Sequence, residues 1–161
     1  MQMLMNQRVD RVCLKDQGLS TFAAHVIGNK ILSHNEELLR IDLSNNQLQT
    51  NFKALVHGIR NNSRLISLTM RNNQINGQDH ADDLKAIVKN HPTLSILDFS
   101  NTELNINKNK LKNVGAAALV EGILETEDYS VISEINLSYN YLTSDSLYYF
   151  ARLDDPDFIQ L

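Results

Sequence analysis

The stretch LLRIDLSNNQL (residues 38–48) places apolar side chains at Leu38, Ile41, Leu43 and Leu48, with Asn46 between the last two. This spacing fits neither the alternation of a half-buried strand nor the 3.6-residue period of a helix. The same eleven-residue block recurs, and its copies are LISLTMRNNQI (65–75), LSILDFSNTEL (94–104), ISEINLSYNYL (132–142) and, less regularly, VDRVCLKDQGL (9–19). The blocks start at 9, 38, 65, 94 and 132, which are 29, 27, 29 and 38 residues apart. A repeat of this size predicts stacked strand–turn–helix units.

We number the block positions one to eleven and call the segments that start with each block units one to five. Between the blocks, apolar residues follow a helical spacing, most clearly Phe52, Leu55, Val56 and Ile59. In the other helical stretches, the side chains expected to face inward are Phe22, Val26, Ile27, Ile31, Leu84, Ile87, Val88, Val114, Ala118, Leu119, Leu124, Leu147, Phe150, Ala151 and Leu153.

The layout of residues 9–153 resembles the ribonuclease-inhibitor-like subfamily of leucine-rich repeats, whose consensus LxxLxLxxNxL the blocks follow. The resemblance implies an α/β solenoid of about five repeats, a horseshoe with a concave parallel β-sheet and convex helices. The chain departs from this pattern where Gln17 and Thr102 replace the Asn of position nine, and where NINKNKLKN (105–113) adds length to unit four.

Size and composition suit one domain over residues 1–161, in which 154–161 form a C-terminal cap or partial repeat with Phe158 and Leu161 at positions one and four. The 15 Lys and Arg against 19 Asp and Glu argue against a nucleic-acid partner. No apolar run reaches the ~18 residues of a membrane span, so we expect no membrane insertion. The single cysteine, Cys13, cannot form an internal disulfide, and together with the absence of a secretory signal it favours a cytoplasmic location.

Asn46, Asn73 and Asn140 recur at position nine of their blocks, which indicates a structural role. After each strand the chain bends inward, and buried backbone groups then need partners at ~1–3 kcal/mol each. An amide side chain supplies both donors and an acceptor. We therefore expect a ladder of Asn side chains that bond the bends of neighbouring units and is interrupted at Thr102.

The variable strand positions carry the functional hypothesis, because alternate residues of a strand face opposite sides. Positions three, five, seven and eight should face the concave side, where Ile96 has no structural reason to be apolar and Arg and Tyr are types enriched in binding hot spots. The predicted partner-binding residues are Arg11, Lys15, Arg40, Asp42, Thr69, Arg71, Ile96, Asp98, Glu134, Asn136 and Tyr139.

We predict no catalytic residues, metal site or cofactor. Asp42 and Asp98 would lie two strands apart, near the separation of a carboxylate pair that hydrolyses glycosides, but on an open face. The main hypothesis is a non-enzymatic module that binds another protein, as a monomer or in a 1:1 heterodimer, and inhibits or masks it. The family resemblance leaves two alternatives, a regulator of a small GTPase and an actin-capping protein. The short, Asn-rich chain also resembles repeat effectors that bacteria such as Legionella deliver into host cells, which would place it in the host cytoplasm.

Overall fold

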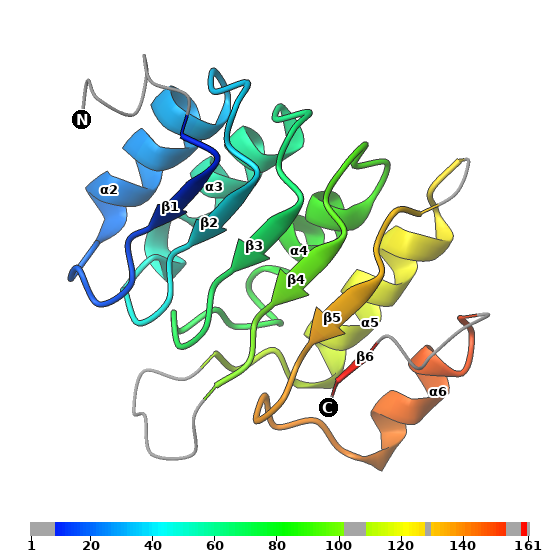
Figure 1. Ribbon diagram of the computed structural model, residues 1–161. Coiled ribbons are helices and arrows are strands. Elements are labelled where there is room, and N and C mark those ends of the chain that lie inside the picture. Colours follow the sequence, from blue (N-terminus) through cyan, green and yellow to red (C-terminus); the bar gives the residue numbers. More distant parts are fainter. Residues whose placement is uncertain (1–8, 102–108, 128–129, 154–158, 161) are drawn as a thin grey trace.

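The computed structural model describes residues 9–101, 109–127, 130–153 and the backbone of 159–160. Its strands form one parallel sheet in sequence order (Figure 1). They are β1 (Arg11–Cys13), β2 (Arg40–Asp42), β3 (Ser67–Thr69), β4 (Ile96–Asp98), β5 (Glu134–Asn136) and β6 (Ile159–Gln160). Each of β1 to β5 spans positions three to five of its block, so the block predicts the strands correctly, and the architecture is α/β with a parallel sheet.

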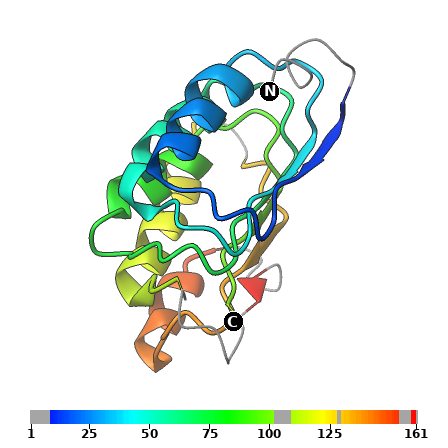
Figure 2. The same ribbon diagram turned by 90° about the vertical axis from the view of Figure 1, so that its left-hand side faces the viewer.

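The helical elements all lie on one side of the sheet, which leaves its other face without helices (Figure 2). We call this helix-free side of β1 to β5 the open face. The helical elements are α2 (Thr21–Val26), the π-helix η1 (Ile27–Leu32), the 3₁₀-helix η2 (Gln49–Asn51), α3 (Phe52–Arg60), α4 (Ala81–Val88), α5 (Lys112–Leu124), the 3₁₀-helix η3 (Ser144–Ser146) and α6 (Leu147–Phe150). Among the described residues no helix combines the length and the apolar character that a membrane crossing requires.

The core lies between the sheet and the helices. The position-four residues Val12, Ile41, Leu68, Leu97 and Ile135 pair in register across the strands, and all are buried. The helical face predicted for α3 is confirmed, because its four predicted side chains are at most 4% exposed.

Five predictions of inward-facing side chains in the other helical stretches are wrong. Phe22, Val114, Leu124 and Leu147 are 76%, 48%, 42% and 55% exposed, and Ala151 is also exposed. In α5 the sequence KNVGAAALVEGIL is apolar around most of the helix, so periodicity alone could not select the buried face. The side of α5 with Gly115 and small alanines packs inward instead, because it allows close approach to the preceding unit.

Glycines also set the spacing of the first two helical layers. A Cβ on Gly58 of α3 would lie 2.2 Å from the carbonyl oxygen of Gly28 in η1, and a Cβ on Gly28 would lie 2.0 Å from that of Ala54. Both distances are far below van der Waals contact. Neighbouring units therefore approach more closely than any residue with a side chain would allow.

The C-terminal tail does form a strand, but in a different register from the one predicted. Ile159 of β6 pairs with Ile135, which holds position four of unit five. Position four of the tail is therefore Ile159 and not Leu161. Phe158 and Leu161 themselves lie outside the described residues.

Candidate functional site

The open face carries the predicted rows of side chains. At position three, Arg11, Arg40, Ser67, Ile96 and Glu134 pair in register across five strands. At position five the row is Cys13, Asp42, Thr69, Asp98 and Asn136. Of the predicted binding residues, Arg11, Lys15, Arg40, Arg71 and Tyr139 are exposed, Asp42, Thr69, Ile96, Glu134 and Asn136 are half-buried, and Asp98 is buried.

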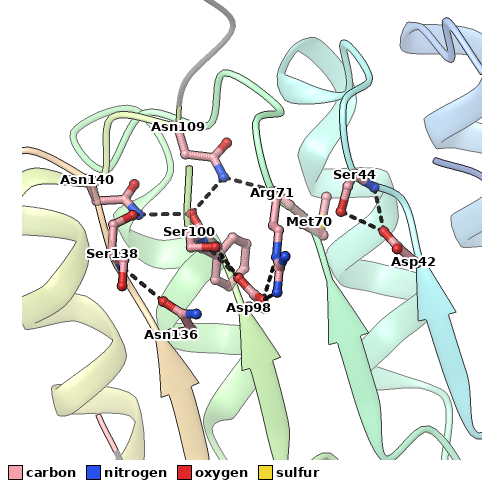
Figure 3. A network of polar contacts seen from close by, with 11 residues as sticks. Asp42, Ser44, Met70, Arg71, Asp98, Ser100, Asn109, Asn136, Ser138 and Asn140 are labelled. Carbon is pink, nitrogen blue, oxygen red and sulfur yellow. Dashed lines mark hydrogen bonds and ion pairs between the residues drawn. The ribbon is translucent and has the colours of Figure 1, made fainter. Parts of the chain in front are cut away.

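The acidic and amide residues of position five are engaged in tight turns. The Oδ1 atoms of Asp42, Asp98 and Asn136 accept the backbone N–H two residues ahead at 2.9, 3.0 and 3.1 Å. The hydroxyls of Ser44 and Ser100 donate to the same Oδ1 atoms of the two Asp residues, at 2.6 and 2.7 Å (Figure 3). This D-x-S or N-x-S turn ends the strands of units two, four and five, and its sequence signature could have been read as a turn.

Unit three lacks this turn and uses a different contact. Thr69 and Arg71 stand in place of the acid and the serine, and Arg71 reaches the next unit, where its Nε and Nη2 lie 2.6 and 2.5 Å from Oδ2 of Asp98 (Figure 3). The hydrogen bond that Arg71 donates to Asp98 is the main cause that raises the pKa of Arg71. Asp98 is only 7% exposed, so little of its carboxylate is accessible on the open face.

The Asn ladder is confirmed as a structural feature. Nδ2 of Asn46 donates to the carbonyl oxygens of Leu14 and Leu43 at 3.0 and 2.8 Å, and its Oδ1 accepts the N–H of Leu19 at 2.9 Å. Asn73 donates to Leu43 O at 2.9 Å, and Asn140 donates to Phe99 O at 2.8 Å. Each side chain thus joins the bend of its own unit to that of the preceding unit.

The ladder has a member in unit four, and it is Asn109. Its Nδ2 donates to Met70 O and Phe99 O, both at 2.9 Å (Figure 3). Its Oδ1 accepts the N–H groups of Asn73 and Ile75 at 2.9 and 3.0 Å. Asn109 is fully buried. The predicted interruption of the ladder is therefore wrong.

Position eleven of unit four is held by Leu111. Leu111 is fully buried, and its N–H donates to Oδ1 of Asn140 at 3.3 Å, so it holds position eleven. Thr102 and Leu104, which had been assigned to positions nine and eleven, lie outside the described residues. Residues 102–108 are thus an insertion between positions eight and nine, and NKL at 109–111 supplies the missing end of the consensus.

The two residues that flank this insertion are joined by side-chain hydrogen bonds. Oδ1 of Asn101 accepts the N–H of Asn109 at 2.5 Å, and its Nδ2 donates to Asn109 O at 3.1 Å and to Tyr139 O at 2.7 Å. Asn101 therefore holds the two ends of the insertion against unit five.

A second ladder of polar side chains, which was not predicted from the sequence, precedes the strands. Its members, Asn35, Asn62 and His91, each lie at the same offset, three positions before position one of a block. Each side chain accepts two backbone N–H groups, one of which belongs to the position-one leucine, at 2.7, 2.7 and 3.0 Å. Asn62 also donates to Leu32 O and Asn35 O, and Nε2 of His91 lies 3.0 Å from Ile59 O. The recurrence of these residues at one offset was the available signal.

His91 of this second ladder is neutral. Its Nδ1 accepts two N–H groups, so the proton sits on Nε2, which donates to Ile59 O. Burial is the main cause that lowers the pKa of His91. The side chain therefore acts as an acceptor, as the two Asn side chains do.

The open face is hollowed over β1 to β3. The hollow has a volume of about 130 Å³ and is lined by Arg11, Val12, Arg40, Ile41, Asp42, Ser67 and Thr69. We call it the arginine hollow, because Arg11 and Arg40 lie opposite each other on β1 and β2. It was not foreseen as a cavity, although every polar residue in it belongs to the predicted rows.

Tyr139 and Tyr141 follow β5, the last strand of the open face. Position eight adopts a positive φ in Asp16, Asn45 and Asn72, at 58°, 57° and 52°, and these are residue types that tolerate it. Tyr139 takes the same conformation at 61° and Tyr141 at 59°, and both are more than half exposed. An exposed tyrosine is an uncommon choice for this backbone geometry.

No protein-family model matches the sequence, and no curated protein matches it significantly. Within the described part of the chain, no three His, Cys, Asp or Glu side chains gather as metal ligands would.

Proposed function

We propose that this chain is a leucine-rich repeat protein of the ribonuclease-inhibitor-like type that binds a partner protein, without catalysis, through its open face. That face would be the concave side of a horseshoe. The observation that supports the proposal is the row of position-three side chains, which five adjacent strands present in register on a face without helices.

The residues of this face fall into two groups. Asp42, Asp98 and Asn136 end strands, and Arg71 binds Asp98, so their side chains serve the fold at least in part. Arg11 and Arg40 form no ion pair within the described residues, and Ile96 exposes apolar surface in a polar row. These three side chains have no comparable structural role, and we infer that they serve binding.

The size of a stable interface explains why several units would take part. Such an interface buries about 1,600 Å² in total, more than a single strand of three residues could supply. Exposed arginines would speed association with an acidic surface, an effect that weakens as salt rises. Ile96 and Tyr139 would slow dissociation because they bury apolar area.

The test compares two matched triple variants in affinity capture followed by quantitative mass spectrometry. The first carries Arg40→Ser, Ile96→Ser and Tyr139→Asn, in which each new residue already occurs at the same position of unit three, as Ser67 or Asn72. The second carries Phe22→Ala, Lys53→Ala and Arg60→Ala on the helical side, where all three side chains are exposed.

The proposal expects the first variant to lose a partner that the second retains, with both variants folded by circular dichroism. Calorimetry with that purified partner should then show an affinity loss for the open-face variant alone. Loss of binding in the helical-side variant, with the open-face variant unaffected, would move the binding site to the helices and refute the proposal.

A further inference from the structure

The arginine hollow combines donors that have no partner among the residues that the structure describes. No carboxylate lies within 4 Å of the guanidinium groups of Arg11 and Arg40 in the described residues, and both side chains are exposed. The hydroxyls of Ser67 and Thr69, which line the same hollow, make no hydrogen bond in the described part of the chain. Four donor side chains thus surround one cavity of about 130 Å³ without acceptors of their own.

The arginine hollow brings the positive charges of Arg11 and Arg40 close together. Arg11 and Arg40 are register partners on adjacent strands, which lie about 4.8 Å apart at the backbone. Arg71 shows how the same face neutralises an arginine, because Asp98 accepts both its Nε and its Nη2. Arg11 and Arg40 have no such counterion in the described part of the chain, so an anion from outside would relieve their repulsion.

Asp42 is the acidic group of the hollow and does not neutralise the arginines. Its Oδ1 accepts the N–H and hydroxyl of Ser44, and no cation lies within 4 Å of its carboxylate in the described residues. The charged groups of the lining are therefore two guanidinium groups and one carboxylate, which leaves a formal charge of +1.

The number of donors favours one kind of anion. Two guanidinium forks can donate four N–H bonds, and the two hydroxyls add two O–H bonds, which makes about six. A carboxylate offers about four acceptor sites on two oxygens. The three terminal oxygens of a phosphate monoester can accept more bonds, and the group carries about −1.5 to −2 charges near neutral pH.

We propose that the arginine hollow binds a phosphate monoester, carried by a phosphorylated serine or threonine of the partner protein. This inference rests on the proposed function, since it names what the partner presents to the open face. Clusters of arginine are a recurrent means of binding phosphorylated side chains. The hollow lies on β1 to β3, so the phosphorylated residue binds at the N-terminal end of the open face, while Ile96 and Tyr139 contact other parts of the partner.

The experiment titrates ¹⁵N-labelled protein with a five-residue peptide of one phosphoserine flanked by glycines, at constant ionic strength. The same peptide with serine, the same peptide with glutamate, and inorganic phosphate are the comparison ligands. The variant Arg40→Ser removes one guanidinium and places in β2 the residue that β3 carries at this position. Arg64→Ser is the control, because it removes the same charge from an exposed residue outside the hollow.

We expect saturable shifts of the amide signals of β1, β2 and β3 with the phosphopeptide, and at least about tenfold weaker binding in Arg40→Ser. Arg64→Ser should bind within about twofold of wild type, since only its distant charge is lost. The amide spectrum of each variant in the absence of ligand verifies that it is folded.

The inference would be overturned if the phosphopeptide failed to saturate, if the glutamate peptide bound as well as the phosphopeptide, or if Arg40→Ser bound the phosphopeptide as well as Arg64→Ser. Inorganic phosphate that binds as tightly as the peptide would assign the hollow to free phosphate and would overturn the assignment to a phosphorylated partner. A capture experiment with Ile96→Ser and Tyr139→Asn alone leaves the hollow intact, so it tests protein binding independently of this inference.

Discussion

Replacing Asn109 by alanine should be among the most destabilising changes in the molecule. Its side chain is fully buried and bonds four backbone groups, the N–H groups of Asn73 and Ile75 and the carbonyl oxygens of Met70 and Phe99. Phe99 O keeps a second donor, Nδ2 of Asn140 at 2.8 Å. The substitution therefore leaves three buried groups without their partner.

The expected loss follows from that count. An unsatisfied buried group costs about 1–3 kcal/mol, so three of them cost about 3–9 kcal/mol, with the lower end expected if water enters the space. Domains of this size have unfolding free energies of about 5–15 kcal/mol. Asn109→Ala should therefore remove a large share of the stability, and the variant should unfold at a much lower urea concentration.

Urea denaturation with two controls measures the effect. Asn113→Ala removes an Asn whose two hydrogen bonds to Thr143 are exposed, and we expect a loss below about 1 kcal/mol. Thr102→Ala alters the residue that the contiguous sequence pattern puts at position nine, and it should cost little because Asn109 fills that place. An Asn109→Ala loss below about 1 kcal/mol, or an equal loss in Thr102→Ala, would refute the assignment of Asn109 to the ladder.

Three further predictions address the insertion, the second ladder and the helix spacing. Deleting residues 102–108, so that Asn101 joins Asn109 as Asn45 joins Asn46, should leave a folded protein whose urea unfolding free energy is within about 1.5 kcal/mol of wild type; an unfolded product would contradict the insertion. Because burial lowers the pKa of His91, the unfolded chain takes up the proton first, so the contribution of His91 to stability is complete above pH ~6.5 and is lost as the pH falls through the folded-state pKa. His91→Asn should keep the bonds and reduce the difference in unfolding free energy between pH 7.5 and pH 5, and an unchanged difference would contradict this role. Gly58→Ala should lower the thermal midpoint by an amount equivalent to about 1–3 kcal/mol, whereas Gly18→Asn, whose Cβ meets nothing within 4 Å at a φ of 61°, should change it little.

The strands could be predicted from the sequence, because the repeated block determines which residue of each strand faces the core. Position four is buried in all five units, and Asn46, Asn73 and Asn140 make the bends as expected. A spacing pattern read in a contiguous window cannot show an insertion, which explains why Thr102 was assigned in place of Asn109. The choice of the buried helical face failed for Val114 because apolar residues surround α5 on most sides.

The candidate site was predicted in outline, and its internal contacts were not. Alternation placed Arg11, Arg40 and Ile96 on the open face, because strand geometry alone decides that. The pairing of Arg71 with Asp98 joins residues 27 positions apart, and it depends on side-chain reach between neighbouring units, which spacing does not specify. The turn formed by Asp42 and Ser44 was legible as a D-x-S motif, but it was read as an acidic binding feature.

The turn bonds and the pair of Arg71 with Asp98 limit which side chains of the open face are available for the proposed binding. Asp98 accepts two bonds from its own turn on Oδ1 and two from Arg71 on Oδ2, and it is buried, so it has little capacity left for another molecule. On β1 to β3, Arg11, Arg40 and two hydroxyls surround the arginine hollow and have no partner among the described residues. Beyond it, Ile96 interrupts the polar row, and Tyr139 keeps a backbone conformation that asparagine would adopt with less strain. A partner that fits this surface would present an anion to the first strands and apolar side chains to the last ones, so its orientation along the units would be fixed by the order of the two contacts.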